Sequence, residues 1–553
     1  MKNGHYRVIW VQFVVIVMVN LLLVGQALAN QERVPLQKNL GEHSYSVSTP
    51  VPTAQQYFDQ GLILAYGFNH AEAMRSFREA VRLDPSCAMC YWGKALVLGP
   101  NINAPMAEAA VPQAYALAQK AVAQSGTATP KEQALIQAVA ARYAEHVIAD
   151  RSHLDQAYAD AMRTVANQFP DDAVIGSLFA ESLMDLHPWD FWTKEGEAKP
   201  WTPEIIKTLE VVLGQNPTNP LANHLYIHMM EASPHPEKAL PSAERLATLV
   251  PGSGHLVHMP GHIYLRIGRY RDAALANQQA VKVDQQYLNH SHAEGIYTSA
   301  YVPHNYHFLW AAAAKTGQQT LAMQAAKDTA GTVNSEGMRD PGMAGTLQHF
   351  WLMPLYTQVL FGQWSEILHA PAPPADLAYP TAMWHYARGL AFMRQGKGEQ
   401  ARQELAAFQQ RAQDPDIAVL TIFDINSVSN IVSIAENVLL GELEATGGQY
   451  EAAVSHLMNA VELEDALHYT EPNDWYLPSR QVLGAVLLQA GQASEAEQVY
   501  RTDLKYHPQN GWSLFGLLQS LQTQGKVDEA RVVRQEFDHA WAESDVTLTS
   551  SRF

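Results

Sequence analysis

Cysteine is nearly absent from this chain of 553 residues, and clusters of basic side chains are missing. The formal net charge is -18, and without clustered Lys and Arg we expect neither a nucleic acid nor an anionic membrane as partner, because phosphate groups need clustered positive charge. A mean hydropathy of -0.18 disfavours a polytopic membrane protein. These deficits leave a soluble, acidic chain whose function must come from other residue types.

The only two cysteines, Cys87 and Cys90, form one C-x-x-C pair. Such a pair can be a redox motif or half of a zinc site, but there is no second pair and no strand pattern typical of a thioredoxin fold. We favour a local disulfide that pins the start of a helix. Redox catalysis and a contribution to a metal site are the alternatives.

An apolar run from Val8 to Gly25 follows two basic residues and precedes Ala27-Leu28-Ala29, the form that signal peptidase reads. We therefore expect residues 1–29 to be a signal peptide that is cleaved after Ala29, and the protein to be periplasmic or secreted. An uncleaved membrane anchor is the alternative, although Gln12 and Asn20 interrupt the run. No cysteine follows the run, which disfavours a lipoprotein.

Helical repeats begin near Ala54, where small and large apolar residues recur as in a tetratricopeptide repeat (TPR). Positions 4, 8, 11, 20, 24, 27 and 32 of that repeat are occupied by Tyr57, Gly61, Leu64, Ala73, Phe77, Ala80 and Pro85. The turns of later repeats are marked by Gly362, Gly396, Gly448, Gly491 and Gly525, where a positive φ is needed. The pattern predicts an all-α fold, a right-handed solenoid of antiparallel helix pairs.

The chain divides into six predicted segments. They are the signal peptide (1–29), a linker (30–50), N-terminal repeats (51–215), histidine-rich repeats (216–331), C-terminal repeats (332–545) and a flexible tail (546–553). In the N-terminal repeats we expect helices at about 107–124, 130–149, 151–168, 172–187 and 202–215. In the C-terminal half we expect repeats at about 348–369, 382–411, 434–465, 477–508 and 511–540.

Histidines recur at helical spacing in the third of these regions. His224 and His228 lie four residues apart and Glu231 lies three further on, so all three share one helix face. The pair returns 34 residues later as His258 and His262, which is the period of the repeat.

A common register follows when Pro220, Gly254 and Pro303 are each placed at position one of a repeat. Position two is then His255 or His304, position five is His224, His258 or His307, position nine is His228 or His262, and position twelve is Glu231. First helices of neighbouring repeats stack about 8–10 Å apart, so we expect these seven imidazoles and the carboxylate to converge in one concave groove.

Imidazoles in such numbers indicate a site for one or two transition-metal ions. Copper or iron is favoured because the site is rich in imidazole and poor in carboxylate, and zinc is possible. Glu231 is the candidate catalytic residue, as a general base beside a metal-bound water. The alternatives are histidines that contact a bound peptide or ligand without metal, and a hydrogen-bonded structural cluster.

Several outer residues are weaker candidates. A loop at Leu98–Pro105 has the sequence to close one end of the groove, and the aromatic stretch Asp185–Trp192 either walls a pocket or only caps a helix. Within the latter, Asp185, His187 or Asp190 would supply further contacts to an ion or a substrate. An insertion places His290 and His292 in a loop on one face, and His349 lies at position two of the following repeat.

Five stretches together resemble a family of exported bacterial TPR proteins with histidine-rich motifs. They are Phe68-Asn69-His70-Ala71-Glu72-Ala73, Gly99-Pro100-Asn101-Ile102-Asn103-Ala104-Pro105, Pro188-Trp189-Asp190, Ala232-Ser233-Pro234-His235-Pro236 and His255-Leu256-Val257-His258-Met259-Pro260-Gly261-His262-Ile263-Tyr264. The resemblance spans most of the mature chain up to about residue 315. It implies a helical-repeat fold and an exported protein, and it implies no particular reaction.

The hypothesis from sequence is therefore an exported TPR metalloprotein, and a metal-dependent oxidoreductase acting on an unknown small molecule is favoured. A non-catalytic scaffold that binds a protein or peptide, with the C-terminal repeats as partner surface, is the first alternative. A metal-dependent hydrolase and a metal storage or delivery protein are the others.

Overall fold

The structure is a computed structural model that describes residues 34–290 and 296–553. The predicted signal peptide, residues 30–33 of the linker, the side chain of His290 and all of His292 lie outside the described residues. Within the described ranges, no helix combines the length and apolar character needed to span a membrane.

The N-terminal repeats are built from eight α-helices of the described chain. Their bounds are α2 (Pro52–Tyr66), α3 (His70–Leu83), α4 (Ala88–Leu96), α5 (Val111–Gln124), α6 (Pro130–Ala141), α7 (Ser152–Gln168), α8 (Ala173–Met184) and α9 (Thr202–Gln215). The helix that the sequence predicts to reach residue 149 ends at Ala141. The next residue, Arg142, is the C-cap, and its buried side chain donates to the carbonyl of Pro100 at 2.9 Å and to Asp185 at 2.7 Å.

Cys87 and Cys90 form the predicted local disulfide. Cys87 is the N-cap of α4, and its sulfur accepts a hydrogen bond from the backbone N–H of Cys90. Both residues are buried in the core, and neither belongs to a histidine cluster.

The histidine-rich repeats contain seven α-helices and one turn of π-helix. Their bounds are α10 (Pro220–Glu231), α11 (Leu240–Leu249), α12 (Gly254–His258), α13 (Pro260–Arg266), α14 (Tyr270–His290), the π turn (Tyr297–Tyr301), α15 (Val302–Lys315) and α16 (Gln319–Gly331). Pro260 divides α12 from α13 because proline has no N–H to donate to the preceding turn. The pieces stay nearly collinear, since Met259 between them keeps helical φ and ψ.

The C-terminal repeats follow the predicted spacing closely. Their helices are α17 (Ala344–Trp351), α18 (Met353–Leu360), α19 (Trp364–His369), α20 (Ala378–Arg394), α21 (Gly398–Ala412), α22 (Pro415–Val419), α23 (Val428–Thr446), α24 (Tyr450–Ala466), α25 (Ser479–Gln489), α26 (Ala493–Tyr506), α27 (Gly511–Thr523) and α28 (Val527–Ala540). All five glycines predicted at the turns have positive φ, between 65° and 77°. An unpredicted hairpin pairs β1 (Thr421–Ile422) with β2 (Asn426–Ser427).

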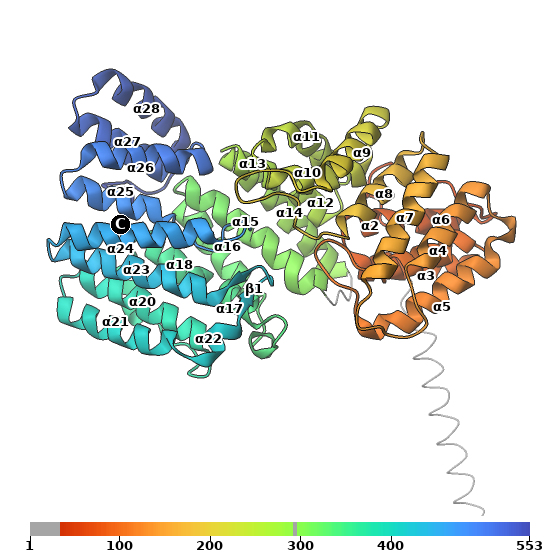
Figure 1. Ribbon diagram of the computed structural model, residues 1–553, viewed down its shortest axis with the longest axis horizontal. Helices are drawn as coiled ribbons and strands as arrows, with labels where there is room; N and C mark the ends of the chain where they lie inside the picture. Colours follow the sequence, from red (N-terminus) through yellow and green to blue (C-terminus); the bar gives the residue numbers. More distant parts are fainter. Residues whose placement is uncertain (1–33, 291–295) are drawn as a thin grey trace, which may run out of the picture.

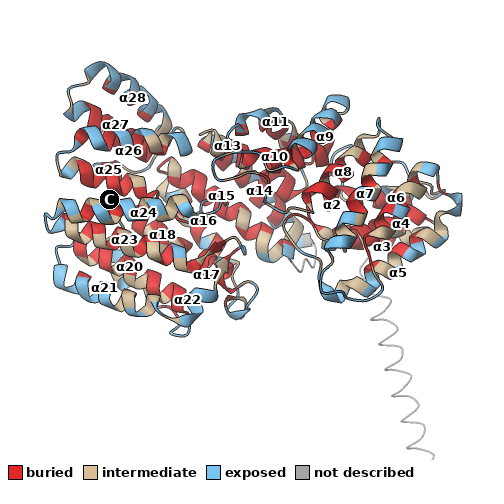
Figure 2. Cartoon of the chain, in the orientation of Figure 1, coloured by how far each residue is buried: buried red, intermediate tan, exposed pale blue. Residues whose placement is uncertain are grey.

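Successive helices pack as antiparallel pairs, and each pair stacks on the next. Among the closest pairs are α2 with α3, α15 with α16, α20 with α21 and α23 with α24. Figure 1 shows these layers running from the N-terminal helices, through the histidine-rich helices, to the C-terminal stack. One large cluster of buried apolar residues extends through the layers, and Figure 2 shows buried residues on helices of every layer. The architecture is a TPR-type helical-repeat solenoid.

The end of the chain is packed, and the predicted flexible tail is wrong. Ser551 is fully buried and donates to the carbonyl of Gln481 at 2.8 Å, while Arg552 forms an ion pair with Glu442 at 2.7 Å. The tail therefore closes the inner face of the last repeats. Neither contact has a sequence signal, because both partners lie far from the tail along the chain.

Candidate metal centre

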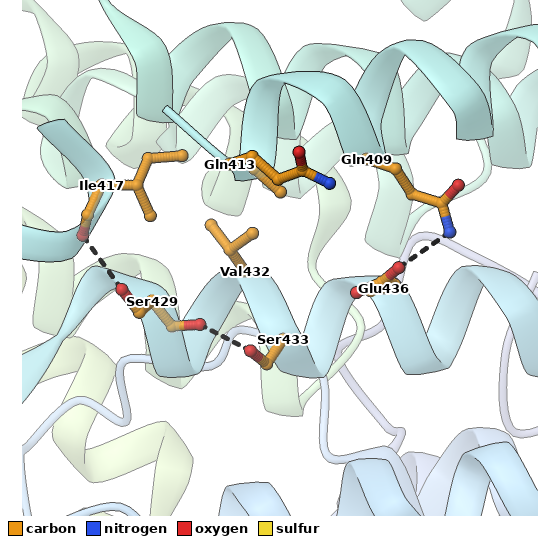
Figure 3. Close-up of a pocket in the computed structure, with 8 residues that line it drawn as sticks. Gln409, Gln413, Ile417, Ser429, Val432, Ser433 and Glu436 are labelled. Atoms are coloured by element: carbon orange, nitrogen blue, oxygen red, sulfur yellow. Dashed lines mark hydrogen bonds between the residues drawn. The ribbon is translucent and has the colours of Figure 1, made fainter. Parts of the chain in front are cut away.

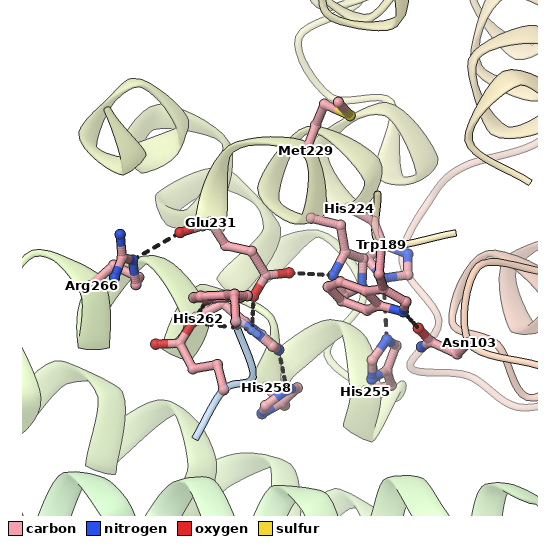
Figure 4. Close-up of polar contacts among 12 residues, drawn as sticks. Asn103, Trp189, His224, Met229, Glu231, His255, His258, His262 and Arg266 are labelled. Carbon is pink, nitrogen blue, oxygen red and sulfur yellow. Dashed lines mark hydrogen bonds and ion pairs between the residues drawn. The ribbon is translucent and has the colours of Figure 1, made fainter. Parts of the chain in front are cut away.

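Six of the seven predicted histidines come together in two groups of three. The first group is His224, His228 and His255, and the second is His258, His262 and His304. Within each group the nearest ring nitrogens lie within 4.8 Å of one another. The Nε2 atoms of His224 and His255 are 3.1 Å apart, and those of His258 and His262 are 2.9 Å apart (Figure 4). Two nitrogens bound to one ion at about 2.0–2.1 Å and near-tetrahedral or square angles are separated by about 2.9–3.4 Å.

Each group is assembled from two consecutive repeats in the same way. Positions five and nine of one repeat supply the pair spaced by four residues, and position two of the next repeat supplies the third ring. For the first group the pair lies on α10, and His255 lies in the first turn of α12. For the second, the pair spans α12 and α13, and His304 lies at the start of α15.

The Nδ1 atoms of four rings are held by oxygen atoms behind them. These pairs are His224 with the carbonyl of Tyr66 at 2.7 Å, His228 with Glu231 at 2.6 Å, His258 with the amide oxygen of Asn277 at 2.7 Å, and His262 with Glu231. A ring nitrogen that donates its proton to such an oxygen leaves the other nitrogen with a lone pair. The four Nε2 atoms are thereby free to face the middle of the two groups.

His258 shows this orientation clearly. Asn277 donates its amide N–H to the carbonyl of Ala273 at 2.8 Å, so its oxygen must accept from His258 Nδ1. His258 Nε2 then carries a lone pair and faces His262 Nε2 at 2.9 Å. His228 Nε2 is also buried, and no described residue is its hydrogen-bond partner. Facing lone pairs need a cation or a proton between them, so the residues fit a bound metal.

Glu231 links the two groups from behind. One carboxylate oxygen contacts His228 Nδ1 and the other contacts His262 Nδ1 (Figure 4). Burial opposes its ionisation, but the positive charge of His262 and hydrogen bonds from both rings outweigh burial and hold the pKa of Glu231 well below its usual range. Burial by itself would lower the pKa of His262, but the negative charge of Glu231 and the hydrogen bond to it outweigh that effect and raise the pKa to about 9.

The remaining rings of the centre are neutral. Burial lowers the pKa of His224, His255, His258 and His304 well below 6.5. The pKa of His228 is lowered by burial as well, although Glu231 opposes that shift. Neutral imidazole is the form that binds metal, so five of the six rings are in that form at neutral pH, whereas His262 must release a proton to bind an ion.

Two aromatic residues with strained backbone wall the first group. Phe68 (φ 56°) packs on His224, with ring centroids 4.7 Å apart, and Trp189 (φ 61°) packs edge-on against His228 at 5.3 Å. Non-glycine residues with positive φ are uncommon, and such strain concentrates at functional sites. Asn103 joins this wall, since it accepts from Trp189 Nε1 at 3.2 Å and donates to Tyr301 at 3.1 Å. The two loops that the sequence predicts as pocket walls do close this end.

The acidic and imidazole side chains of the stretch Asp185–Trp192 pair with residues outside the two histidine groups. Asp185 pairs with Arg142, His187 stacks on Trp201 with ring centroids 3.6 Å apart, and Asp190 pairs with Lys199. None of the three belongs to either histidine group.

A third wall comes from the C-terminal repeats and was not predicted. The segment between α24 and α25 places Glu471 3.6 Å from His262 Nδ1, and Glu231, His262 and Glu471 make a further group of ligand type. Tyr469 lies within hydrogen-bonding distance of both carboxylates. With these walls, five of the six rings are at most 2 % exposed and His304 alone is half-buried, so the two groups lie in an enclosed centre.

His307 is the predicted ligand that lies apart from the two groups. It lies at position five of the third repeat, so its geometric partners are position nine of the same helix and position two of the next. Its ring accordingly faces His349, with centroids 5.9 Å apart, and also packs on Trp310 and Phe350. Burial lowers the pKa of His307 well below 6.5 and that of His349 to about 4.

The C-terminal repeats hold a separate hollow of about 420 Å³ between α21, α22 and α23 (Figure 3). Its lining includes Gln409, Ile417, Ser433 and Glu436, and Gln409 donates to Glu436 at 2.9 Å. The lining has no histidine or cysteine. A partner on these repeats remains a prediction.

No protein-family model matches the chain, and none of the curated proteins resembles it significantly in sequence. Among solved structures it is similar to the human IFIT1 dimer with m7Gppp-AAAA, at 12% identity over 92% of this chain and 93% of that chain, with a TM-score of 0.33. It is also similar to the APC/C hetero-tetramer Cut9-Hcn1, at 11% identity over 90% and 89% of the chains, with a TM-score of 0.29.

Proposed function

We propose that the protein is a dinuclear metalloprotein in which each ion is bound by three imidazoles. The observation that carries this proposal is the pair of His₃ groups whose inward nitrogens are spaced as ligands of one ion. The groups adjoin, since the rings of His228 and His262 have centroids 5.5 Å apart and those of His255 and His258 5.7 Å apart. Glu231 holds one ring of each group, so the two ions would be positioned together.

The donor atoms favour oxidoreductase chemistry. Copper is the preferred metal, and iron is the second choice. Both carboxylate oxygens of Glu231 are engaged by Nδ1 atoms, which argues against its predicted role as a general base and against the hydrolase alternative. Two adjacent ions with three imidazole nitrogens each would supply paired one-electron steps, as in dioxygen chemistry. A harder ion such as iron would find oxygen donors in the group of Glu231, His262 and Glu471.

The chain's own residues would orient ligands and exclude water. Glu231 and Asn277 fix the rings, while Phe68 and Trp189 cover the first group with apolar surface. The half-buried His304 marks the side from which a small substrate would approach.

The first test is elemental analysis of untagged full-length protein after anaerobic loading with copper, iron or zinc. We expect two ions per chain, and an absorption spectrum that reports on the copper or iron form. His224→Ala and His262→Ala are each expected to remove most of one ion while the helical circular dichroism is kept. His385→Ala is the matched control, because this half-buried histidine pairs with Glu404 far from the centre.

Sub-stoichiometric metal after every loading would contradict the proposal and leave the scaffold alternative. Two bound ions without any turnover of oxidisable small molecules would instead support storage or delivery. Loss of the fold in both histidine variants would support a structural cluster.

We also propose that the chain is exported, as the signal sequence predicts. A disulfide between Cys87 and Cys90 supports this location, because such bonds persist in oxidising compartments. Terminal sequencing of the native protein from a periplasmic or culture fraction should begin at Asn30. A chain that keeps residues 1–29 and sediments with membranes would support the anchor alternative.

A further inference from the structure

The third histidine-bearing repeat begins another unit of the pattern that builds the two groups. In each group, positions five and nine of one repeat combine with position two of the next. The same positions one unit later are His307, Ala311 and His349. Alanine replaces the middle imidazole, so this unit keeps two potential ligands.

The spacing of the two rings matches that of the complete groups. His307 on α15 and His349 on α17 have ring centroids 5.9 Å apart at an interplanar angle of 66°. Pairs within the complete groups span 4.8 to 6.2 Å. A ring bound through nitrogen at about 2.0–2.1 Å has its centroid roughly 3 Å from the ion, so this spacing allows both rings to bind one ion.

The ring nitrogens of His307 lack hydrogen-bond partners among the described residues. The residue is 1 % exposed, and both ring nitrogens are buried. Buried polar atoms of this kind are rare in folded proteins, because each one costs the free energy of its lost hydration.

His349 is oriented from behind, as the ligands of the complete groups are. Its Nδ1 lies 3.0 Å from the hydroxyl of Tyr379, and that hydroxyl lies 2.8 Å from the hydroxyl of Tyr356. The phenol chain can accept the Nδ1 proton, which leaves a lone pair on Nε2. This support takes the place that Asn277 and the Tyr66 carbonyl have in the complete groups.

The surroundings select an ion of low charge. The rings packed around the pair are aromatic, with Trp310 and Phe350 beside His307 and Tyr356 beside His349. Among the described residues, neither histidine has a carboxylate partner, in contrast to His228 and His262 with Glu231. A buried divalent ion without a counter-charge is costly, whereas monovalent copper binds stably between two neutral imidazoles.

We propose that His307 and His349 form a third metal site, which binds one monovalent copper ion between their two imidazoles. The site is separate from the dinuclear centre and needs no ion there.

The test is an anaerobic titration of full-length protein with Cu(I) against a competing chromogenic chelator. We expect His307→Ala and His349→Gln each to lose one tight equivalent relative to the wild-type chain. The affinity at that site should fall by more than about 100-fold, which exceeds the 10- to 100-fold cost of losing a supporting residue. His385→Ala should lose no equivalent. Folded variants that bind as much Cu(I) as the wild-type chain would overturn the proposal.

A gain-of-function variant covers the case in which the ligand variants do not fold. Ala311→His restores the missing position nine, and we expect it to raise the affinity of the third site for Cu(I) by at least about 10-fold, as a third ligand should exceed a supporting residue. A folded Ala311→His protein with unchanged affinity would also overturn the proposal. A third outcome separates the two proposals. If His307→Ala loses one equivalent of Cu(I) and the six histidines of the two groups bind no metal, the dinuclear centre is disproved and the third site is supported.

Discussion

The hydroxyl of Tyr469 lies 3.2 Å from a carboxylate oxygen of Glu231 and so joins two residues 238 positions apart. Arg266 contacts both residues. Its guanidinium lies 5.5 Å from the centre of the Tyr469 ring, and its Nε donates to the backbone carbonyl of Glu231 at 2.8 Å. The C-terminal repeats therefore complete the centre that the histidine repeats begin. These repeats therefore contribute residues to the centre, in addition to the partner surface that the sequence predicts.

Tyr469→Phe should weaken metal binding while the fold is kept. The substitution removes the phenol oxygen that lies beside both Glu231 and Glu471, and a hydrogen bond to a charged group contributes about 1.5–3 kcal/mol. We expect metal affinity to fall by about 10-fold or less, since Tyr469 acts on the ligands only through Glu231. Competition with a metal chelator measures the change. Tyr506→Phe is the control because Tyr506 is 55 % exposed, and an equal effect in both variants would contradict the prediction.

Glu231→Gln should have the larger effect. The amide keeps the size of the side chain but loses the negative charge, and it cannot accept from both Nδ1 atoms at once. Loss of such a supporting carboxylate costs about 10- to 100-fold in metal affinity, and here both ions should be affected. Titration calorimetry with the favoured metal measures both sites.

The matched control for that substitution is Glu404→Gln. Glu404 accepts from His385 Nδ1 at 2.6 Å and from Arg388 at 2.7 Å, which reproduces the carboxylate–imidazole contact away from the centre. We expect it to lower the thermal midpoint without changing metal affinity. If both variants lose metal equally, the effect of Glu231 is only a general loss of stability.

Local periodicity was enough to predict the helices and the histidine pairs. Residues four apart on a helix share a face, so His224 with His228 and His258 with His262 could be paired from the sequence alone. The period of 34 residues then placed His255 on the next repeat. Both inferences depend on spacing within two neighbouring units, which a solenoid preserves.

The same periodicity misplaced His307, because it did not show which positions of neighbouring repeats combine. The sequence predicts one groove shared by all three repeats, whereas each group joins positions five and nine with position two of the next repeat. The π turn at Tyr297–Tyr301 precedes α15, and its Tyr297 hydroxyl accepts from the backbone N–H of His255 at 3.2 Å.

Contacts between distant segments had no signal in a single sequence. Glu471 and Tyr469 lie in an irregular segment with no histidine motif, and Asn277 lies on α14, which carries no ligand of either histidine group. The buried centre is closed by these residues and by two loops. Only the loops have a composition, aromatic and proline-rich, that suggested a wall.

Gly261→Ala should disturb the centre through a single methyl group. A Cβ at this position would lie 2.6 Å from the amide nitrogen of Asn277, whose oxygen accepts from His258 Nδ1. Asn277 must shift and release His258, so we expect metal affinity to fall by about 10- to 100-fold. Overpacking should also lower the free energy of unfolding by about 1–3 kcal/mol.

Gly214→Ala is the control for that prediction. Gly214 lies in α9, and an added Cβ would meet no atom within 4 Å. Alanine favours the helix over glycine by about 0.5–1 kcal/mol, so this variant should be slightly more stable and bind metal normally. Normal metal binding in Gly261→Ala would show that Asn277 does not hold His258 in place.

Asn103→Ala should accelerate metal loss from the first group more than it weakens binding at equilibrium. Asn103 accepts from Trp189 and donates to Tyr301, and these rings cover His228 and His255 respectively. Without the amide, two hydrogen bonds of about 0.5–1.5 kcal/mol each are lost and the wall opens more often, so the rate of extraction by a strong chelator should rise about 10-fold. Stopped-flow absorbance of the chelator complex measures that rate for each ion. The second group should release its ion at the wild-type rate, because neither ring covers it.

Asn437→Ala is the control, since among the described contacts Asn437 donates to the carbonyl of Ser433 within α23. Equal acceleration of both ions, or acceleration in the control, would show that the loop is not the gate of the first group.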